Sequence, residues 1–479
     1  MAAFGLMELI LMVMLGGGSM GNDLIDYLPS NLYWQTQGVE LKSDVLLHEL
    51  DDKPGVPVDA RRYIENLGSA SAEVRDQASE ALRKLGGVVV PDLEKASQSS
   101  NPEVAQRAQL LLKALHDNAR APALRRLMAI RALGELKDPS AAAVLTKLAK
   151  SKRPFEAEYA QAALAAIAGK PVTRKGITPA ERAGDLWLLP KDSGLVAQMA
   201  IEPGGPVDLR AMVQPMTAMM GGEPQALDAA VEGVTRQVLQ IAQRTGNLRL
   251  TSVTLGLNEN PKAGAVIILR GLYDAKALGP AIQSANPQAA ITQVGGVEVV
   301  EVSQNRAYLV LADSHRAVLI AGDPQLPMPV EAMVNACQAG KGTLNENKDL
   351  VALLKTVDTT LPIWGVAKMN DSYRQLPNSQ PFDSVTLAGI KAGDMGSFTV
   401  TATGKDPVAV AASVQAVNQE IEKVKAELAQ PRMGALPFTQ AIKSILDSVR
   451  CASAGGTATL RWEMKGSPLG IVLGVLLPG

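Results

Sequence analysis

The feature that most limits how this chain can fold is an alanine–leucine pattern that recurs within residues 58–168. Each occurrence places small or apolar residues at positions i, i+4 and i+7, which is one face of one helix. The occurrences begin at Ala78, Ala108, Ala129 and Ala160, so they are separated by 30, 21 and 31 residues. A recurrence near 30 residues predicts similar helices stacked side by side, because one such helix cannot bury its apolar face alone. We therefore predict an α-solenoid over residues 58–168.

Proline-initiated helices agree with this pattern. Asn101-Pro102 and Asp138-Pro139 each place a capping side chain before a proline, at the helical position where a missing N–H costs nothing. The segments that begin there, NPEVAQRAQLLLKAL and DPSAAAVLTKLAKSKRPFEAEYAQAALAAI, resemble short bacterial HEAT-like repeats of the PBS lyase type. This resemblance implies a surface for protein–protein contact and specifies no ligand. The four complete patterns are Ala78, Leu82, Leu85; Ala108, Leu112, Leu115; Ala129, Leu133, Leu136; and Ala160, Leu164, Ile167.

The first 20 residues form an apolar segment with one charged side chain, Glu8, and no lysine or arginine occurs before Lys42. The apolar run from Leu9 to Leu15 precedes three glycines at residues 16–18. This composition predicts membrane contact or export, although a secretory signal would carry basic residues before its apolar run. The alternative is a helix docked on this protein or on a partner. We expect a membrane-associated or exported protein, with a cytoplasmic location as the alternative.

The remaining chain divides into further regions, since 479 residues exceed what one hydrophobic core organises. Residues 21–57 are predicted to form a linker with short helices, and residues 169–184, rich in Gly, Pro and charge, a second linker. From residue 185 onward short β-rich runs alternate with helices, as in an α+β layer fold with helices on one face. The predicted architecture is multi-domain, with a HEAT-like α-solenoid followed by an α+β region.

Two stretches of the α+β region match each other, which predicts a tandem duplication. SVTLGL at Ser252 corresponds to SVTLAG at Ser384, and a second strand, a glycine, an aspartate and a helix follow each. We place the copies at residues 185–345 and 346–479 and expect a β-β-β-α core in each. The region resembles bacterial α+β proteins that follow HEAT-like repeats. The matching pairs are Ser252 and Ser384, 132 residues apart; Gly271 and Gly404, 133 apart; and Asp274 and Asp406, 132 apart.

The helix predicted after Asp406 carries an apolar stripe at four- and three-residue spacing, which must be buried. We expect it to pack on its own sheet, with pairing to another chain as the alternative. Methionines at residues 212, 216, 219 and 220 are expected to fill a core or to form an adaptable binding lip. The stripe consists of Val410, Val414, Val417, Ile421, Val424 and Leu428.

No catalytic, cofactor or metal site is predicted. The three histidines, His48, His116 and His315, lie in different segments, which disfavours a shared metal site. Cys337 and Cys451 lack the spacing of a metal knuckle or a redox pair. His315 is expected in a tight turn, and AGKGT at residues 339–343 lacks the residue order of a phosphate-binding loop. With a net charge of −1 and 3% aromatic residues, the chain is not expected to bind DNA.

The strongest local charge feature lies between Arg120 and Arg153. This stretch has nine basic residues and two acidic ones, Glu135 and Asp138, which is an excess of seven positive charges. A basic solenoid face would bind an acidic protein, phospholipid headgroups or RNA; the alternative is a solvated helical surface. We select Arg125, Arg126 and Arg131 as candidate partner-binding residues. The nine are Arg120, Arg125, Arg126, Arg131, Lys137, Lys147, Lys150, Lys152 and Arg153.

These features predict a non-catalytic protein–protein interaction scaffold that needs no cofactor. The expected partners are proteins, with a membrane contact through residues 1–20 and self-association also compatible with the sequence. One alternative is a carrier or sensor that holds an apolar small molecule in the α+β region. A second alternative is an enzyme of unrecognised type.

Overall fold

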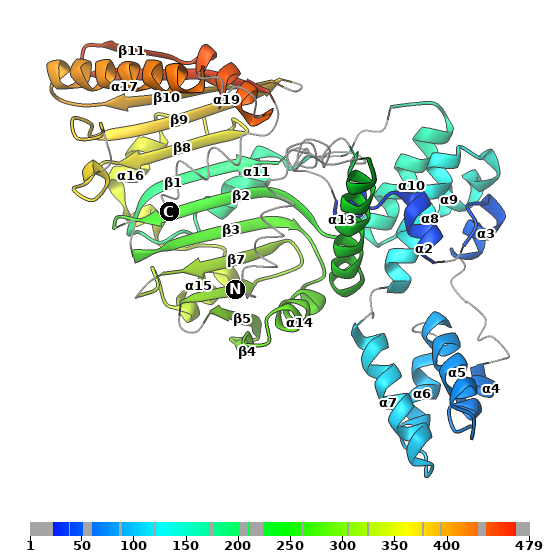
Figure 1. Cartoon of the computed structure of the whole chain (residues 1–479). Coiled ribbons are helices and arrows are strands. Elements are labelled where there is room, and N and C mark those ends of the chain that lie inside the picture. Colours follow the sequence, from blue (N-terminus) through cyan, green and yellow to red (C-terminus); the bar gives the residue numbers. More distant parts are fainter. Residues whose placement is uncertain are drawn as a thin grey trace. The chain divides into compact units, whose positions relative to one another are not determined.

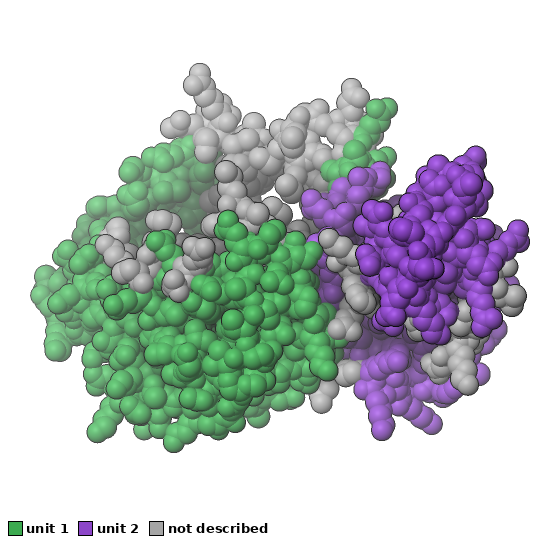
Figure 2. Space-filling model, turned by 90° about the horizontal axis from the view of Figure 1, so that it is seen from below, with its two compact units in different colours: residues 1–23, 175–231, 249–479 green, residues 24–174, 232–248 purple. Residues whose placement is uncertain are grey.

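The computed structural model describes residues 23–465, except residues 38, 51–59, 86–88, 118–120, 172–173, 175, 202–208, 211–223, 261–262, 304–305, 323–324, 376–377, 393–394 and 430–436. The apolar segment 1–20 and the methionine-rich segment 212–220 therefore lie outside the described residues. The chain divides into two compact units, coloured separately in Figure 2. Unit 1 comprises residues 1–23, 175–231 and 249–479, and unit 2 comprises residues 24–174 and 232–248.

Unit 2 is helical. Its described elements are η1 (Leu24–Tyr27), α2 (Ser30–Thr36), α3 (Ser43–His48), α4 (Ala60–Asn66), α5 (Ala72–Leu85), α6 (Val90–Ala96), α7 (Pro102–Asp117), α8 (Ala121–Leu136), η3 (Pro139–Ala141), α9 (Ala142–Leu148) and α10 (Pro154–Ile167). Helix α13 (Pro224–Thr245) contributes its residues from Glu232 onward. Helices η1, α2 and α3 lie between residues 24 and 48, and Trp34 of α2 is fully buried.

The repeating apolar pattern lies where helices of unit 2 pack together. Ala78 and Leu82 of α5 share a buried cluster with Ala108 of α7, and helices α8 and α10 pack against each other. At Gly134 of α8 a side-chain carbon would lie 2.8 Å from the Cα atom of Ala163 in α10, so glycine permits this close approach. The 30- and 31-residue spacings therefore mark packed helix pairs. The 21-residue spacing joins α7 to α8, which belong to different pairs.

Unit 1 is built on one antiparallel sheet, which Figure 1 shows as a continuous surface of strands. The strand order is β11-β12-β10-β9-β8-β1-β2-β3-β7-β6-β5-β4. The strands are β1 (Ser193–Ala200), β2 (Arg249–Asn258), β3 (Ala265–Leu272), β4 (Ala290–Val294), β5 (Val297–Ser303), β6 (Ala307–Leu311), β7 (Arg316–Ala321), β8 (Ile363–Lys368), β9 (Ser384–Ala392), β10 (Met395–Thr403), β11 (Arg450–Ala454) and β12 (Thr457–Lys465). Both predicted copies contribute to this sheet, and β1 joins β8 at its middle.

The two sequences that match each other occupy corresponding places in the two halves of the sheet. Outward from the β1/β8 pair, β2, β3, β7 and β6 on one side correspond to β9, β10, β12 and β11 on the other. Gly271 donates its N–H to the carbonyl of His315 in the β6–β7 turn, and Gly404 donates to Gly456 in the β11–β12 turn, both at 2.8 Å. Asp274 caps α14 (Ala275–Ala285) as Asp406 caps α17 (Pro407–Leu428).

Helices pack on both faces of the sheet, which corrects the expectation of one covered face. We call the face that carries Val196 and Ile268 face one, and the opposite face, which carries Leu269 and Phe398, face two. On face one α11 (Pro179–Leu186), α15 (Val330–Ala339) and α16 (Lys348–Leu354) cover the first half. On face two α14 covers the first half, and α17 with α19 (Pro437–Ser448) cover the second. The two short helices η5 (Leu344–Glu346) and η6 (Tyr373–Gln375) complete the described elements of unit 1.

The linker predicted for residues 169–184 is wrong at its C-terminal end, where α11 begins. Thr178 and Glu181 form a reciprocal capping box, and Pro179 occupies the first helical position. Arg182 and Asp185 then lie buried against the sheet. Proline and charged residues, from which we predict a linker, instead start a helix and anchor it.

Candidate functional site

Two of the three arginines predicted to bind a partner are held by acidic and aromatic groups of unit 2. Arg125 of α8 forms an ion pair with Glu49, and its guanidinium carbon lies 5.3 Å from the centre of the Trp34 ring. Arg126 forms an ion pair with Glu156 at 3.0 Å, and both side chains are largely buried. These contacts attach the segment before α4 and helix α10 to α8. Both arginines therefore have a structural role within the unit.

Arg131, the third, is 9% exposed and lies within the core of the unit. It forms an ion pair with Glu135 at 2.8 Å and donates to the carbonyl of Ile25 at 2.5 Å. Partner binding by the three arginines stays a prediction, but reversing their charges would break contacts inside unit 2. The exposed lysines of the same basic stretch are Lys137, Lys147, Lys150 and Lys152.

A groove of about 700 Å³ opens in unit 2 between α3 and the turn that follows α8. Its size is in the range of sites that hold small molecules or short peptide segments. Leucines line it together with aspartates and serines, so it joins apolar contact to negative charge. The lining residues are Leu41, Lys42, Ser43, Asp44, Leu47, Leu136, Asp138, Pro139 and Ser140.

Leu136, which lines the groove, belongs to the repeated apolar pattern. Among the pattern residues whose burial the structure describes, it is the one that is clearly exposed. Ala129 and Leu133 of α8 are fully buried, but Leu136 is 42% exposed. The next residue, Lys137, has φ of 53°, a left-handed conformation in which a helix usually ends on glycine. The last turn of α8 therefore presents its leucine to the groove and changes direction through a strained residue.

The negative charge of the groove is held in place by hydrogen bonds. The Ser43 hydroxyl, followed by the backbone N–H of Ser140, holds the pKa of Asp138 below its usual value, so this carboxylate stays charged at neutral pH. Asp44 is exposed beside it. The only basic lining residue described, Lys42, forms an exposed ion pair with Glu40 at 2.9 Å. The groove thus suits a ligand with aliphatic and basic groups.

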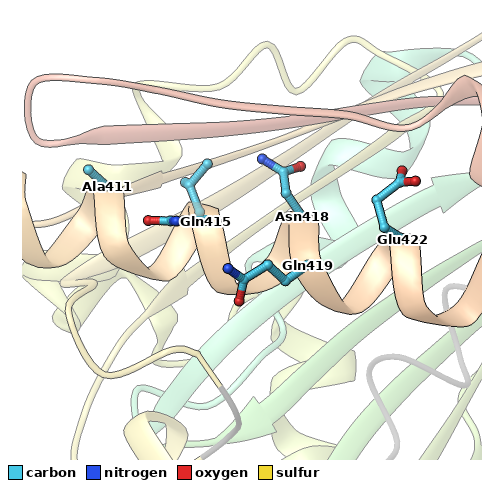
Figure 3. A pocket seen from close by; sticks show the side chains of 6 residues that line it. Ala411, Gln415, Asn418, Gln419 and Glu422 are labelled. Atoms are coloured by element: carbon cyan, nitrogen blue, oxygen red, sulfur yellow. The ribbon is translucent and has the colours of Figure 1, made fainter.

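A second groove, of about 530 Å³, runs along α17 in unit 1. Figure 3 shows amide and carboxylate side chains along this side of the helix, including Gln415, Asn418 and Glu422. Asn418 donates to the carbonyl of Cys451 in the edge strand β11 at 3.3 Å, so part of this polar surface is already used. The apolar stripe predicted for α17 is buried at Val410, Val414 and Leu428 and half-buried between them.

The other residues considered for chemistry have structural places. Asp313 accepts hydrogen bonds from the backbone N–H groups of His315 and Arg316, which makes the expected turn between β6 and β7. In the AGKGT segment, Gly340 ends α15 with φ of 64°. Cys337 is buried in the core, and this burial raises the pKa of its thiol to about 11.

The described residues contain neither a candidate metal site nor a candidate membrane span. No group of three or more His, Cys, Asp and Glu side chains there is arranged to hold a metal ion. No helix within the described ranges is long and apolar enough to cross a bilayer. The segment 1–20, on which the membrane prediction rests, is outside those ranges.

Comparison with known proteins finds a family match within the helical region. Residues 125–151 match the family model of the PBS lyase HEAT-like repeat, as the sequence had indicated. The match includes most of α8, the strained turn and α9, and hence Leu136 and Asp138 of the groove. No curated protein matches the chain.

Among solved structures, two crystal forms of TP0453 resemble the chain weakly. Crystal form I shares 11% identity with a TM-score of 0.33, covering 61% of this chain and 96% of that chain. Crystal form III shares 10% identity with a TM-score of 0.35, covering 60% and 97%. These TM-scores are too low to assign a common fold. Unit 2 thus contains a HEAT-like repeat whose turn lines a leucine- and aspartate-rich groove.

Proposed function

We propose that this protein is a non-catalytic interaction scaffold whose HEAT-like region binds a partner protein in the groove beside Leu136. The observation that carries the proposal is the exposure of this leucine at a position where the repeat pattern calls for a buried one. Departures from an otherwise consistent pattern concentrate at functional sites. HEAT-like repeats generally serve protein–protein contact, which supports the same conclusion.

The groove's chemistry favours a partner segment with an aliphatic side chain next to lysine or arginine. Leu41, Leu47 and Leu136 offer partly exposed apolar surface, while Asp44 and Asp138 supply charge. The described lining residues include no histidine or cysteine that would pair with Ser43 or Ser140 as a nucleophilic centre. A binding role uses both the leucines and the aspartates of the groove.

The test compares two exposed leucines of the same unit. Leu136→Glu places a third negative charge in the groove, whereas Leu110→Glu changes α7 at a side chain that is 62% exposed. Tagged wild-type and variant proteins would be purified from the native host, and co-purifying proteins quantified by mass spectrometry. We expect a partner that co-purifies equally with wild type and with Leu110→Glu. The amount of this partner should fall by about tenfold or more with Leu136→Glu. An identical set from all three folded proteins would reject the groove.

We also infer that the helices of residues 58–168 form an α-solenoid and that the sheet arose by duplication of a β-β-β-α unit. The packed pairs α5/α7 and α8/α10 support the first inference. The equivalent glycine contacts and helix caps of the two sheet halves support the second. Both would be rejected if an alignment of related sequences showed independent boundaries for the repeats and for the two halves.

We further propose that the scaffold is held at a membrane or exported through residues 1–20. Their single charge and apolar run support this, because the transfer of apolar side chains out of water is favourable. A carbonate wash of membranes combined with intact-mass analysis of the N-terminus tests it. Carbonate-resistant, uncleaved protein would support anchoring, and a cleaved N-terminus would support export. Wash-released protein with an intact N-terminus would reject both.

A further inference from the structure

The second half of the sheet leaves part of face one without a covering helix among the described residues. Pairing registers place Thr386 of β9, Thr401 of β10 and Thr459 of β12 on this face, in line with the buried Val366. The exposed or half-exposed side chains here are mostly hydroxylated, so water covers them at little cost. The end of this face near the β9–β10 turn differs from the rest.

Strand pairing places four residues on neighbouring rows at that end, and we call them the tip patch: Ile390, Met395, Arg450 and Arg461. Ile390 is 54% exposed and Met395 43% exposed, which makes them two of the most exposed large apolar residues described. They belong to adjacent rows of face one, because Ile390 pairs with Ser397 and Met395 pairs with Ala392. Two large apolar side chains on adjacent rows of an exposed face are the kind of group that inserts into a membrane interface.

The next row of the same face brings two arginines directly opposite each other. Arg450 of β11 pairs with Arg461 of β12, and Arg461 pairs with Thr399 of β10. Like charges directly opposite across strands are destabilising. Neither arginine forms an ion pair with any residue the structure describes, although Arg450 donates to the carbonyls of Asp447 and Val449. Such a pair is favourable once an anion neutralises it.

The size of the tip patch decides what kind of partner fits. Three rows on four strands extend roughly 14 Å in each direction, since strands lie about 4.8 Å apart and alternate residues about 7 Å apart. The resulting area, roughly 200 Å², is far below the 800 Å² per partner of a stable protein interface. An interfacial membrane contact needs only a few apolar side chains inserted beside cations that meet anionic headgroups.

We propose that the tip patch binds the surface of an anionic lipid bilayer. Ile390 and Met395 enter the headgroup region, and Arg450 and Arg461 bind lipid phosphates. The neighbouring Glu463, exposed on the same face, limits the affinity and makes the contact reversible. The tip patch shares no residue with the groove of unit 2 or with residues 1–20.

The test is sedimentation of the full-length protein with vesicles of phosphatidylcholine alone or with 30% phosphatidylserine. Arg450→Gln/Arg461→Gln should weaken binding to the anionic vesicles by about tenfold or more and change binding to neutral vesicles little. Ile390→Ser/Met395→Ser should weaken both. The matched control is Lys405→Gln/Val408→Ser, which removes an exposed cation and a 78% exposed valine at the opposite strand end.

A second readout separates lipid binding from loss of structure. Removing the opposed arginines should change the melting temperature little, because the relief of their repulsion offsets the loss of the Arg450 hydrogen bonds to Asp447 and Val449. The proposal would be overturned if the tip variants bound anionic vesicles as tightly as wild type does. It would also be overturned if the control variant lost as much vesicle binding as the tip variants. Partner capture through the groove should be unaffected by every tip variant, so the two proposals fail independently.

Discussion

The two halves of the sheet share an architecture but treat face one in opposite ways. In the first half Val266, Ile268, Val318 and Ile320 are fully buried beneath helices. In the second half the strands that correspond to β3 and β7 carry Thr399, Thr401, Thr459 and Arg461 on that face. Valine, isoleucine and threonine are all β-branched and favour strands, so both halves keep the same backbone. Hydroxyl groups in place of methyl and ethyl groups, together with Arg461, remove the need for a helix over this face.

The substitution with the largest expected effect on stability removes the ion pair beneath α11. Asp185 is fully buried and makes two charge-assisted hydrogen bonds of 2.6 Å with Arg270 of β3. At the corresponding position of β10 stands Thr403, which is exposed. Asp185→Asn leaves an uncompensated cation and should lower the free energy of unfolding by about 3–5 kcal/mol. Urea denaturation measures it, and a loss below about 1 kcal/mol would show that α11 does not depend on the pair.

An exchange of β-branched residues sharpens the comparison directly. Ile268→Thr in the covered half should destabilise unit 1 by about 2–3 kcal/mol, because it removes buried carbon and buries a hydroxyl. Thr401→Ile, at the corresponding position of the open half, should change stability by about 0.5 kcal/mol or less. The shift in urea midpoint measures both. Equal effects would mean that the open half is covered in solution.

The helix caps test whether the halves are equivalent. Asp274 accepts a hydrogen bond from the N–H of Lys276, and Asp406 accepts from Val408 and Ala409. Each change to alanine should cost about 1 kcal/mol in thermal or urea unfolding. A cost at only one site would argue that the matching sequences have different structural roles.

The last test compares the reactivity of the two cysteine thiols and requires no substitution. Burial raises the pKa of Cys337, in the covered half, to about 11, so its reactive thiolate is a minor species at pH 8. Cys451, on the edge strand of the open half, is half-buried and its pKa is also raised by burial. A thiol reagent at pH 8 should label Cys451 first and Cys337 only after unfolding. Labelling Cys337 first would contradict the packing of α15.

Much of this fold could be predicted from sequence, because strands and helices are local patterns. The SVTL strands, the caps at Asp274 and Asp406 and the stripe of α17 follow from residue spacing. The joining of both halves into one sheet does not, since Val196 and Val366 pair across a long stretch of chain. No local periodicity specifies such a pairing.

The candidate site was predicted less well, for two physical reasons. Arg125 looked free because its partner Glu49 lies 76 residues away in the sequence. Leu136 looked buried because its spacing matches the core pattern, and only the turn signal that follows it, Asp138-Pro139, hints that the helix ends there. The HEAT-like character of this segment was nevertheless correctly identified.

The most direct test of a partner site in the groove of unit 2 is photo-crosslinking from inside that groove. A benzoylphenylalanine at Leu47, which lines the groove, would be compared in living cells with the same residue at Leu110 on α7. If a partner binds in the groove, position 47 will give a discrete protein adduct that Leu136→Glu abolishes, and position 110 will give no such adduct. The same adducts from both positions, or an adduct at 47 that survives Leu136→Glu, would contradict a partner site in this groove.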